Sequence, residues 1–163
     1  EMLRSLVGSE MCIRDRPNTP ALVGEGITGV CKNNLVTEDE FAYVLKLLSS
    51  FGLAEAIPES LMDAVVSVSG SSPAYVFLFI EAMADAAVAD GMPRAQAYKF
   101  AAQAVLGSAK MVLETGKHPA ELKDMVCSPA GTTIEAVRVL EEKGFRGAVM
   151  DAMKACTAKA KGI

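Results

Sequence analysis

A short polar loop at residues 128–133 separates two stretches of helical pattern, and its residue types could bind an anion. The loop reads Ser-Pro-Ala-Gly-Thr-Thr. Pro129 disfavours helical backbone at Ser128, so the preceding helix is predicted to end there. Gly131 permits a bend that a Cβ would resist. Free backbone N–H groups at the start of the next helix, beside three hydroxyl groups, would suit a carboxylate or a phosphate.

The helix after this loop is predicted to begin with Thr132 as its N-cap. Glu135 follows three residues later, which is the spacing of a capping box. Apolar residues recur at helical spacing over residues 134–140, and Lys143 with Gly144 ends the helix. The plain alternative is a well-capped helical hairpin without a ligand, because capping boxes are common.

Two long helices are predicted before this loop. Residues 74–90 are apolar on nearly every side apart from Glu81 and Asp85, and residues 94–115 oppose one polar stripe with many small or apolar residues. A helix of the first kind is expected to be buried, and small residues let helices approach closely. One small domain has difficulty covering so much apolar helix, which favours a partner chain as the cover. A self-contained bundle is the alternative.

The N-terminal part is predicted to hold two short strands and one amphipathic helix. Thr37 and Glu40 form a second capping box, and the helix they open runs to Gly52. Residues 27–31 suggest a bent strand and residues 53–57 a short one. Two strands around one helix do not make a sheet of their own, so a partner sheet is expected.

Gly24, Gly26 and Gly29 match G-x-G-x-x-G, the spacing of the dinucleotide fingerprint. That fingerprint must follow a buried strand and open a helix. Here a proline-rich turn precedes the glycines and residues 30–34 open no helix. No βαβ unit and no later acidic ribose ligand fit either. We interpret the match as coincidental.

Residues 122–141, LKDMVCSPAGTTIEAVRVLE, closely resemble the signature of the pyrroline-5-carboxylate reductase family. Two further motifs share the resemblance. PNTP at residues 17–20 resembles the hinge between the two domains of that family. SGSSPAY at residues 69–75 resembles its SGSGPAY motif, with Ser72 in place of a glycine. The resemblance begins at Pro17 and runs to the C-terminus.

The resemblance implies a mainly α fold, the helical dimerisation domain of the 6-phosphogluconate dehydrogenase C-terminal-like type. The two N-terminal strands would extend the sheet of a dinucleotide-binding Rossmann domain that this sequence lacks. Residues 17–58 would form the hinge, the edge strands and one helix, and residues 59–163 the dimerisation and substrate-binding domain. Residues 1–16 lack a clean period and look like translated foreign sequence, so they are left out of the fold prediction.

The resemblance also implies a site. Backbone N–H groups of the loop would hold the carboxylate of 1-pyrroline-5-carboxylate, a cyclic imine acid. The expected substrate-binding residues are Ser128, Gly131, Thr132 and Thr133. The Thr133 hydroxyl would orient the ring nitrogen, which makes Thr133 the expected catalytic residue. The residues expected to face the nicotinamide cofactor are Asn18, Thr19, Pro20 and Ser71.

By resemblance, the function is reduction of this imine to L-proline with NADPH or NADH in proline biosynthesis. The chain would supply the dimer interface and the carboxylate loop. Because the nucleotide-binding half is absent, the chain alone is expected to be inactive and to bind no cofactor tightly. The expected partners are the small substrate and further copies of the chain, as a homodimer or higher homo-oligomer.

Two other functions remain open. The first is a non-catalytic helical self-association module. The second is a relative in the wider hydroxyacid dehydrogenase group, which typically carries a catalytic lysine on a helix where this motif offers Thr133.

Composition argues against several other classes. The 163 residues are 51% apolar and 22% charged, which is typical of a globular chain with a core. A net charge of −4 without a basic stripe argues against nucleic acid. The longest apolar run, residues 74–80, is too short to cross a bilayer. No signal-peptide pattern is found, so a cytoplasmic location without membrane insertion is expected.

Cysteine and histidine usage argues against a metal site. The four cysteines lie far from metal-ligand spacing and are expected to be free thiols, and His118 is the only histidine. We expect His118 to be a solvated turn residue rather than a catalyst.

Overall fold

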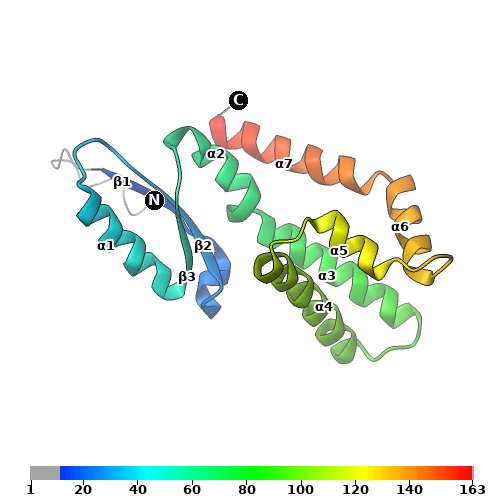
Figure 1. Cartoon of the computed structure of the whole chain (residues 1–163). Helices are drawn as coiled ribbons and strands as arrows, with labels where there is room; N and C mark the ends of the chain where they lie inside the picture. Colours follow the sequence, from blue (N-terminus) through cyan, green and yellow to red (C-terminus); the bar gives the residue numbers. More distant parts are fainter. Residues whose placement is uncertain (1–11, 163) are drawn as a thin grey trace. The chain divides into compact units, whose positions relative to one another are not determined.

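The computed structural model describes residues 12–162, in which three strands, with one helix between the last two, are followed by a series of helices (Figure 1). The strands are β1 (Ile13–Arg16), β2 (Gly26–Lys32) and β3 (Gly52–Ala56). The α-helices are α1 (Glu38–Leu48), α2 (Met62–Val65), α3 (Ser72–Ala89), α4 (Arg94–Thr115), α5 (Pro119–Val126), α6 (Thr132–Glu142) and α7 (Phe145–Lys161). Short 3-10 turns cover Thr19–Val23, Ser49–Phe51 and Glu59–Leu61, and a π-helix covers Val66–Gly70. The prediction of a mainly helical chain is confirmed.

Contacts between residues divide the chain into two compact units, which we describe separately. The N-terminal unit holds the chain up to Pro73 together with the segment from Met153 onward. The helical unit is Ala74–Ala152. The predicted boundary at residue 58 stays a prediction.

The sheet of the N-terminal unit has three strands in the order β1-β2-β3. β1 pairs antiparallel with β2, and β2 pairs parallel with β3. The expectation of two strands was wrong, because β1 lies in the segment left out of the fold prediction and three of its four residues are charged. Whether residues 1–16 are foreign stays a prediction, and residues 1–11 lie outside the described part of the chain.

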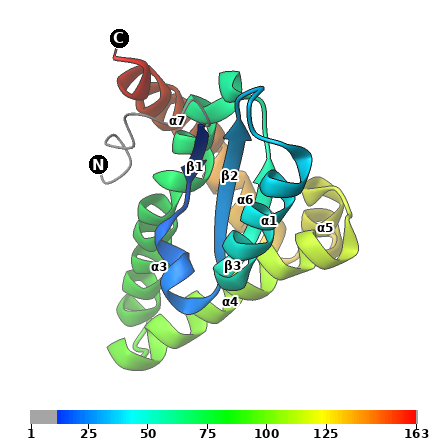
Figure 2. The ribbon, with the colours of Figure 1, turned by 90° about the vertical axis from the view of Figure 1, so that its left-hand side faces the viewer.

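Because α1 joins the parallel strands β2 and β3, this region is a βαβ unit, and the prediction that none exists was wrong. Figure 2 shows α1 against one face of the sheet. The core between them is formed by Val30, Val36 and Phe41. The predicted capping box of α1 is confirmed, since Thr37 and Glu40 exchange both of its hydrogen bonds.

The glycines of the G-x-G-x-x-G match serve the sheet. Gly24 adopts left-handed backbone, with φ of 77°, at the end of a 3-10 turn, and β2 rather than a helix begins at Gly26. Gly26 lies opposite Gly52 in the parallel ladder. A Cβ on Gly52 would lie 2.0 Å from the Gly26 carbonyl oxygen, so the strands approach too closely for any other residue. The predicted context, glycines that open no helix, is confirmed.

The segment before α3 is a π-helix that runs directly into α3. Val66–Gly70 is a π-helix in which the Ser71 N–H donates to the Val66 carbonyl at 2.8 Å, and α3 already begins at Ser72. Ser72, which stands in place of a glycine in the family motif, is therefore a helical residue. The α-helical partner of the Ser69 carbonyl would be the N–H of residue 73, which is a proline and has none. The helix widens at this point instead of ending.

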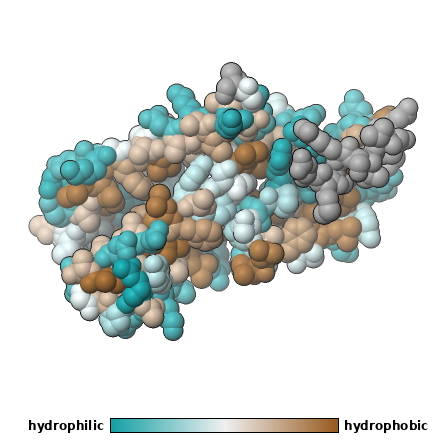
Figure 3. Space-filling view, turned by 180° about the vertical axis from the view of Figure 1, so that it is seen from behind, coloured by the Kyte–Doolittle hydropathy of each residue, from teal (hydrophilic) through white to brown (hydrophobic). Residues whose placement is uncertain are grey.

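The helical unit buries little of its own apolar surface. Among its described residues only Ala84, Ala97 and Ala101 are buried. Phe77 and Leu78 on α3 are 60% and 67% exposed, so the expectation that α3 is centrally buried was wrong for a single chain. The space-filling view shows brown, hydrophobic surface over this unit (Figure 3).

One helical stretch, Glu59–Ala89, is long and apolar enough to cross a membrane by length and composition. The apolar run over residues 74–80 ends at Glu81, so the sequence pattern alone did not predict this longer stretch. The criterion is weak by itself, because core helices of soluble proteins also meet it.

Gly52→Ala should destabilise the N-terminal unit, because the new Cβ meets the Gly26 backbone and because φ at Gly52 is 146°. We expect a loss of about 3 kcal/mol or more. Gly147→Ala in α7 is the matched control, since the added methyl group would meet no other atom within 4 Å. That variant should gain about 0.5–1 kcal/mol of helix propensity. Chemical denaturation of both variants checks this, and a Gly52→Ala protein as stable as the parent would contradict the close approach.

Candidate functional site

The predicted substrate loop lies in the helical unit, between α5 and α6. Helix α5 ends at Val126, as the proline signal predicted. The Gly131 N–H donates to the Ser128 carbonyl at 3.0 Å, which closes a tight turn through Pro129 and Ala130. Ala130 has φ of 56° and is the one non-glycine residue with positive φ in the described chain. Such backbone costs about 1–2 kcal/mol, and residues of this kind gather at functional sites.

The start of α6 lies one residue earlier than predicted. Its N-cap is Gly131, with extended backbone and no hydrogen bond from a side chain, and Thr132 is already helical. The predicted capping box of Thr132 with Glu135 was therefore wrong. The turn through Ala130 brings Gly131, rather than Thr132, to the extended N-cap conformation. The first-turn N–H groups of α6 consequently have no side-chain cap and are open to a ligand.

Gly131 is required here for space rather than for its φ, which is an ordinary −78°. A Cβ at this position would lie 2.3 Å from the Ser128 Oγ atom. The Ser128 hydroxyl thus lies directly beside the N-cap of α6. Thr132 and Thr133 are the first two residues of the helix, and Thr133 is half-buried while Ser128 and Thr132 are exposed. The four predicted substrate residues therefore meet at one helix N-terminus.

An acidic residue in the first turn of α6 is paired within the helix. Arg138 donates to the carboxylates of Glu135 and Glu142. These hydrogen bonds hold the pKa of Glu135 below its ordinary value and raise the pKa of Arg138. The pairing offsets the repulsion that Glu135 would exert on a bound carboxylate.

The loop itself contains neither a strong acid nor a strong base. His118 lies at the other end of α5, where its Nδ1 accepts the Ala120 N–H at 3.1 Å as the N-cap of that helix. It is exposed, as predicted. The four cysteines are free thiols, also as predicted. Among the described residues no three His, Cys, Asp or Glu side chains gather around a potential metal position.

The residues predicted to face the cofactor lie in the N-terminal unit. The Asn18 Oδ1 atom accepts the Ile27 N–H at 2.9 Å, and its Nδ2 donates to the Ser69 carbonyl at 3.1 Å. Asn18 therefore ties the start of β2 to the π-helix, and Ser71 directly follows that π-helix. Thr19 is exposed and Pro20 half-buried in the adjoining 3-10 turn. The structure thus brings Asn18 and Ser71 to one segment.

The βαβ unit does not fit the phosphates of a dinucleotide. The positive end of α1 is already capped by Thr37, and its first turn carries Glu38, Asp39 and Glu40, which would repel an anion. Asn18, Thr19, Pro20 and Ser71 carry no charged side chain, so they offer no cation to a phosphate.

Comparison with known proteins agrees with this description. A family model described as pyrroline-5-carboxylate reductase dimerisation matches residues 59–163. The pyrroline-5-carboxylate reductase of Escherichia coli K12 is 66% identical over 163 residues, which are 100% of this chain and 61% of that protein. The reductase of Synechocystis is 52% identical over 143 residues, 88% of this chain and 54% of that protein.

A crystal structure of the Plasmodium falciparum pyrroline carboxylate reductase with NADP bound superposes with a TM-score of 0.89 at 38% identity. It covers 96% of this chain, and this chain covers 63% of it. The family match defines residues 59–163 as a dimerisation domain. The chain belongs to the pyrroline-5-carboxylate reductase family.

Alanine substitution should lower stability more at Thr37 than at Thr132, although both residues lie at helix starts. Thr37 accepts the Glu40 N–H as a true N-cap, whereas Thr132 makes no capping bond. Thr37→Ala should lose about 1 kcal/mol of stability. Thr132→Ala should change stability by less than about 0.5 kcal/mol. Denaturant melts at neutral pH measure both.

The Thr37 effect should also depend on pH. Hydrogen bonds from the Thr37 side chain and backbone lower the pKa of Glu40. A lowered pKa contributes stability above the unfolded-state value, and this contribution is lost as pH falls through the folded-state value. The difference between parent and Thr37→Ala should therefore shrink in acid. A larger loss for Thr132→Ala than for Thr37→Ala at neutral pH would restore Thr132 as the cap.

Proposed function

We propose that this chain provides the dimerisation and substrate-binding part of an NADPH- or NADH-dependent pyrroline-5-carboxylate reductase, in the cytoplasm. The observation that carries the proposal is the uncapped N-terminus of α6 with the hydroxyl of Ser128 beside it, in a chain of this family. The substrate would be a cyclic imine acid and the product L-proline.

The loop would bind the substrate carboxylate without a cationic side chain. The first-turn N–H groups of α6 carry the partial positive charge of the helix, and they point out of its N-terminus. The Ser128 Oγ atom would add a hydroxyl donor from the side. The turn at Ala130 keeps these donors together before the substrate arrives, so little ordering is needed on binding.

Thr133 would orient the ring of the substrate. It is the second residue of α6 and is half-buried, and its hydroxyl makes no hydrogen bond among the described residues. Its Oγ would bond to the imine nitrogen while the neighbouring N–H groups hold the carboxylate. The nicotinamide, when bound, supplies the hydride that the imine carbon accepts. An imine that is already protonated needs no further acid, which agrees with a loop that lacks one.

Asn18, Thr19, Pro20 and Ser71 would contact the nicotinamide end of the cofactor. The acidic start of α1 does not fit its phosphates. We therefore expect the chain alone to bind NADPH or NADH weakly and to turn over no substrate. The chain spans 61% of the length of the Escherichia coli relative.

The exposed apolar faces of α3 and α4 would be covered by a second copy of the chain. The same faces would equally serve the second candidate, a self-association module without catalysis. The N-terminus of α6 favours the reductase, because association between copies does not require a helix start that lacks a side-chain cap. The expected absence of nucleic acid and membrane partners stays a prediction.

A chimera tests the proposal directly. It joins residues 1–163, which include strand β1, to the part of the Escherichia coli reductase that lies outside the matched region. Oxidation of NADPH in the presence of 1-pyrroline-5-carboxylate should be measurable for the chimera and absent for the chain alone. A folded chimera without activity would overturn the reductase proposal. Activity of the chain alone would overturn the expectation for its isolated state.

Thr133→Ala in that chimera should lower kcat/KM more than it lowers stability. One lost neutral hydrogen bond costs about 0.5–1.5 kcal/mol, and more if the bond aligns the transition state. Ser49→Ala is the control, since the Ser49 hydroxyl donates only to the Leu45 carbonyl of α1. Steady-state kinetics measure the change in kcat/KM, and thermal melts measure the change in stability. If Thr133→Ala keeps normal kcat/KM while Thr132→Ala loses it, the hydroxyl that orients the ring belongs to Thr132.

A further inference from the structure

A buried serine lies inside the π-helix and is bonded to the far end of the chain. Ser67 is 3% exposed. Its hydroxyl donates to the Ala64 carbonyl at 2.9 Å and accepts from the Thr157 hydroxyl, also at 2.9 Å. Thr157 lies on the last turns of α7, in the part of that helix that belongs to the N-terminal unit. A hydrogen-bonded chain therefore runs from α7 into the π-helix.

The preceding residue of α7 makes a second bond of the same kind. The Cys156 thiol donates to the Ser71 Oγ atom at 3.2 Å. Ser67 lies within the π-helix and Ser71 is its C-terminal cap. Two consecutive residues of α7 therefore hold this segment at two points, one inside it and one at its end.

A third bond reaches the π-helix from the hinge. The Asn18 Nδ2 atom donates to the Ser69 carbonyl, which has lost its α-helical donor to Pro73. The segment is thus held at Ser67, Ser69 and Ser71 by side chains from outside it. The π form is rare and occurs frequently at functional sites.

We propose that Thr157 and Cys156 are positioning residues for the cofactor side of the site. They act through Ser67 and Ser71 and keep the segment in the π form. Without these bonds the segment can leave the π form and open, which changes the direction of Ser71 and removes the Ser69 carbonyl from Asn18. The C-terminal turns of α7 would then support the nicotinamide site from outside, without contacting the ligand. This role rests on the proposed function.

The first test uses hydrogen exchange on this chain and does not require activity. Thr157→Val keeps the shape of the side chain and removes the hydroxyl donor, whereas Thr157→Ser keeps the donor. The Ser71 N–H, bonded to the Val66 carbonyl at 2.8 Å, reports whether the π-helix is intact. Thr157→Val should speed its exchange by about tenfold, and Thr157→Ser should restore protection.

The control is Thr115→Val, since the Thr115 hydroxyl donates within its own helix, to the Met111 carbonyl at 2.6 Å. It should leave exchange at residues 66–71 unchanged. Unchanged exchange in Thr157→Val, or equal acceleration in the control, would overturn the proposal. If Thr157→Val does not fold, Cys156→Ala, which removes only the bond to Ser71, decides by the same measurement.

The second test separates positioning from general stability in the active chimera. Thr157→Val should raise the KM for NADPH severalfold and leave the KM for the imine acid unchanged, and Thr157→Ser should restore the parent value. Equal changes in both KM values, or a fall in kcat alone, would contradict a role on the cofactor side. An inactive parent chimera would reject the proposed function, and hydrogen exchange alone would then decide whether α7 holds the π-helix.

Discussion

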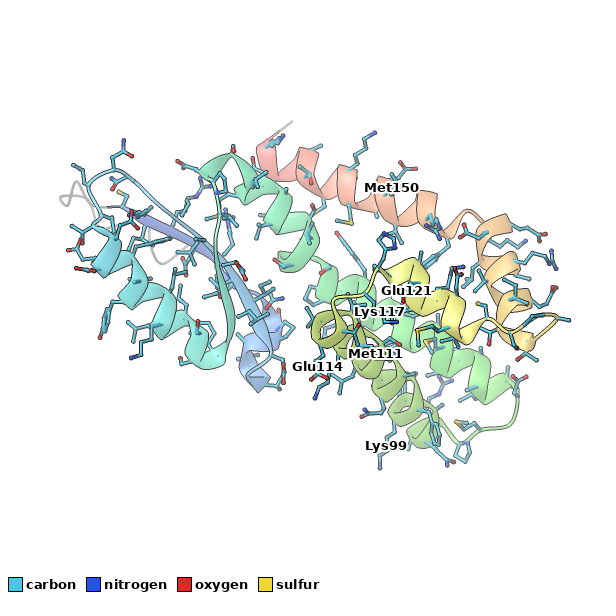
Figure 4. The ribbon with its side chains drawn as sticks, viewed as in Figure 1. Lys99, Met111, Glu114, Lys117, Glu121 and Met150 are labelled. Carbon is cyan, nitrogen blue, oxygen red and sulfur yellow. The ribbon has the colours of Figure 1, made fainter. Side chains whose placement is uncertain are left out.

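The exposed apolar surface of α3 and α4 is the constraint on which the helical unit depends. Only three alanines of that unit are buried among its described residues, and a hollow of about 470 Å³ between these helices is lined by residues such as Phe79, Met83 and Val112. An exposed apolar surface of this size is typical of an interface with another molecule. Lys99 and Glu114 belong to the polar stripe of α4, while the exposed side chains of Met111 on α4 and Met150 on α7 suit contact with a protein surface (Figure 4). The match to a dimerisation domain agrees with a second copy.

Hydroxyl groups serve two different purposes in the two units, and their partners decide which. In the N-terminal unit, Ser67 and Thr157 bond to each other and hold an unusual backbone in place. In the helical unit, Thr132 and Thr133 begin a helix without capping it, so their hydroxyl groups remain available to the proposed substrate. The same residue types thus build structure where their bonds are satisfied internally, and they form the proposed substrate site where they are not.

Local signals made much of the fold predictable, while contacts between distant residues did not. The capping box at Thr37, the end of α5 before Pro129 and the end of α6 at Lys143 each depend on a few neighbouring residues. The bonds that Asn18 and Thr157 make to the π-helix join residues far apart in the sequence, and no local pattern reveals them. β1 was missed because its charged residues hide the strand. The register of α6 shifted because Ala130 adopts a backbone that sequence rules assign to glycine. The site residues came from the family resemblance rather than from spacing.

Light scattering of the whole chain at micromolar concentration tests the central claim most directly. The parent should have the mass of a dimer. Leu78→Glu, which places a charge on the exposed face of α3, should reduce the mass to that of a monomer or unfold the chain. Leu22→Glu, at a residue 87% exposed in the N-terminal unit, is the matched control and should remain dimeric. A well-folded monomeric parent would contradict the claim that a second copy covers the apolar helices.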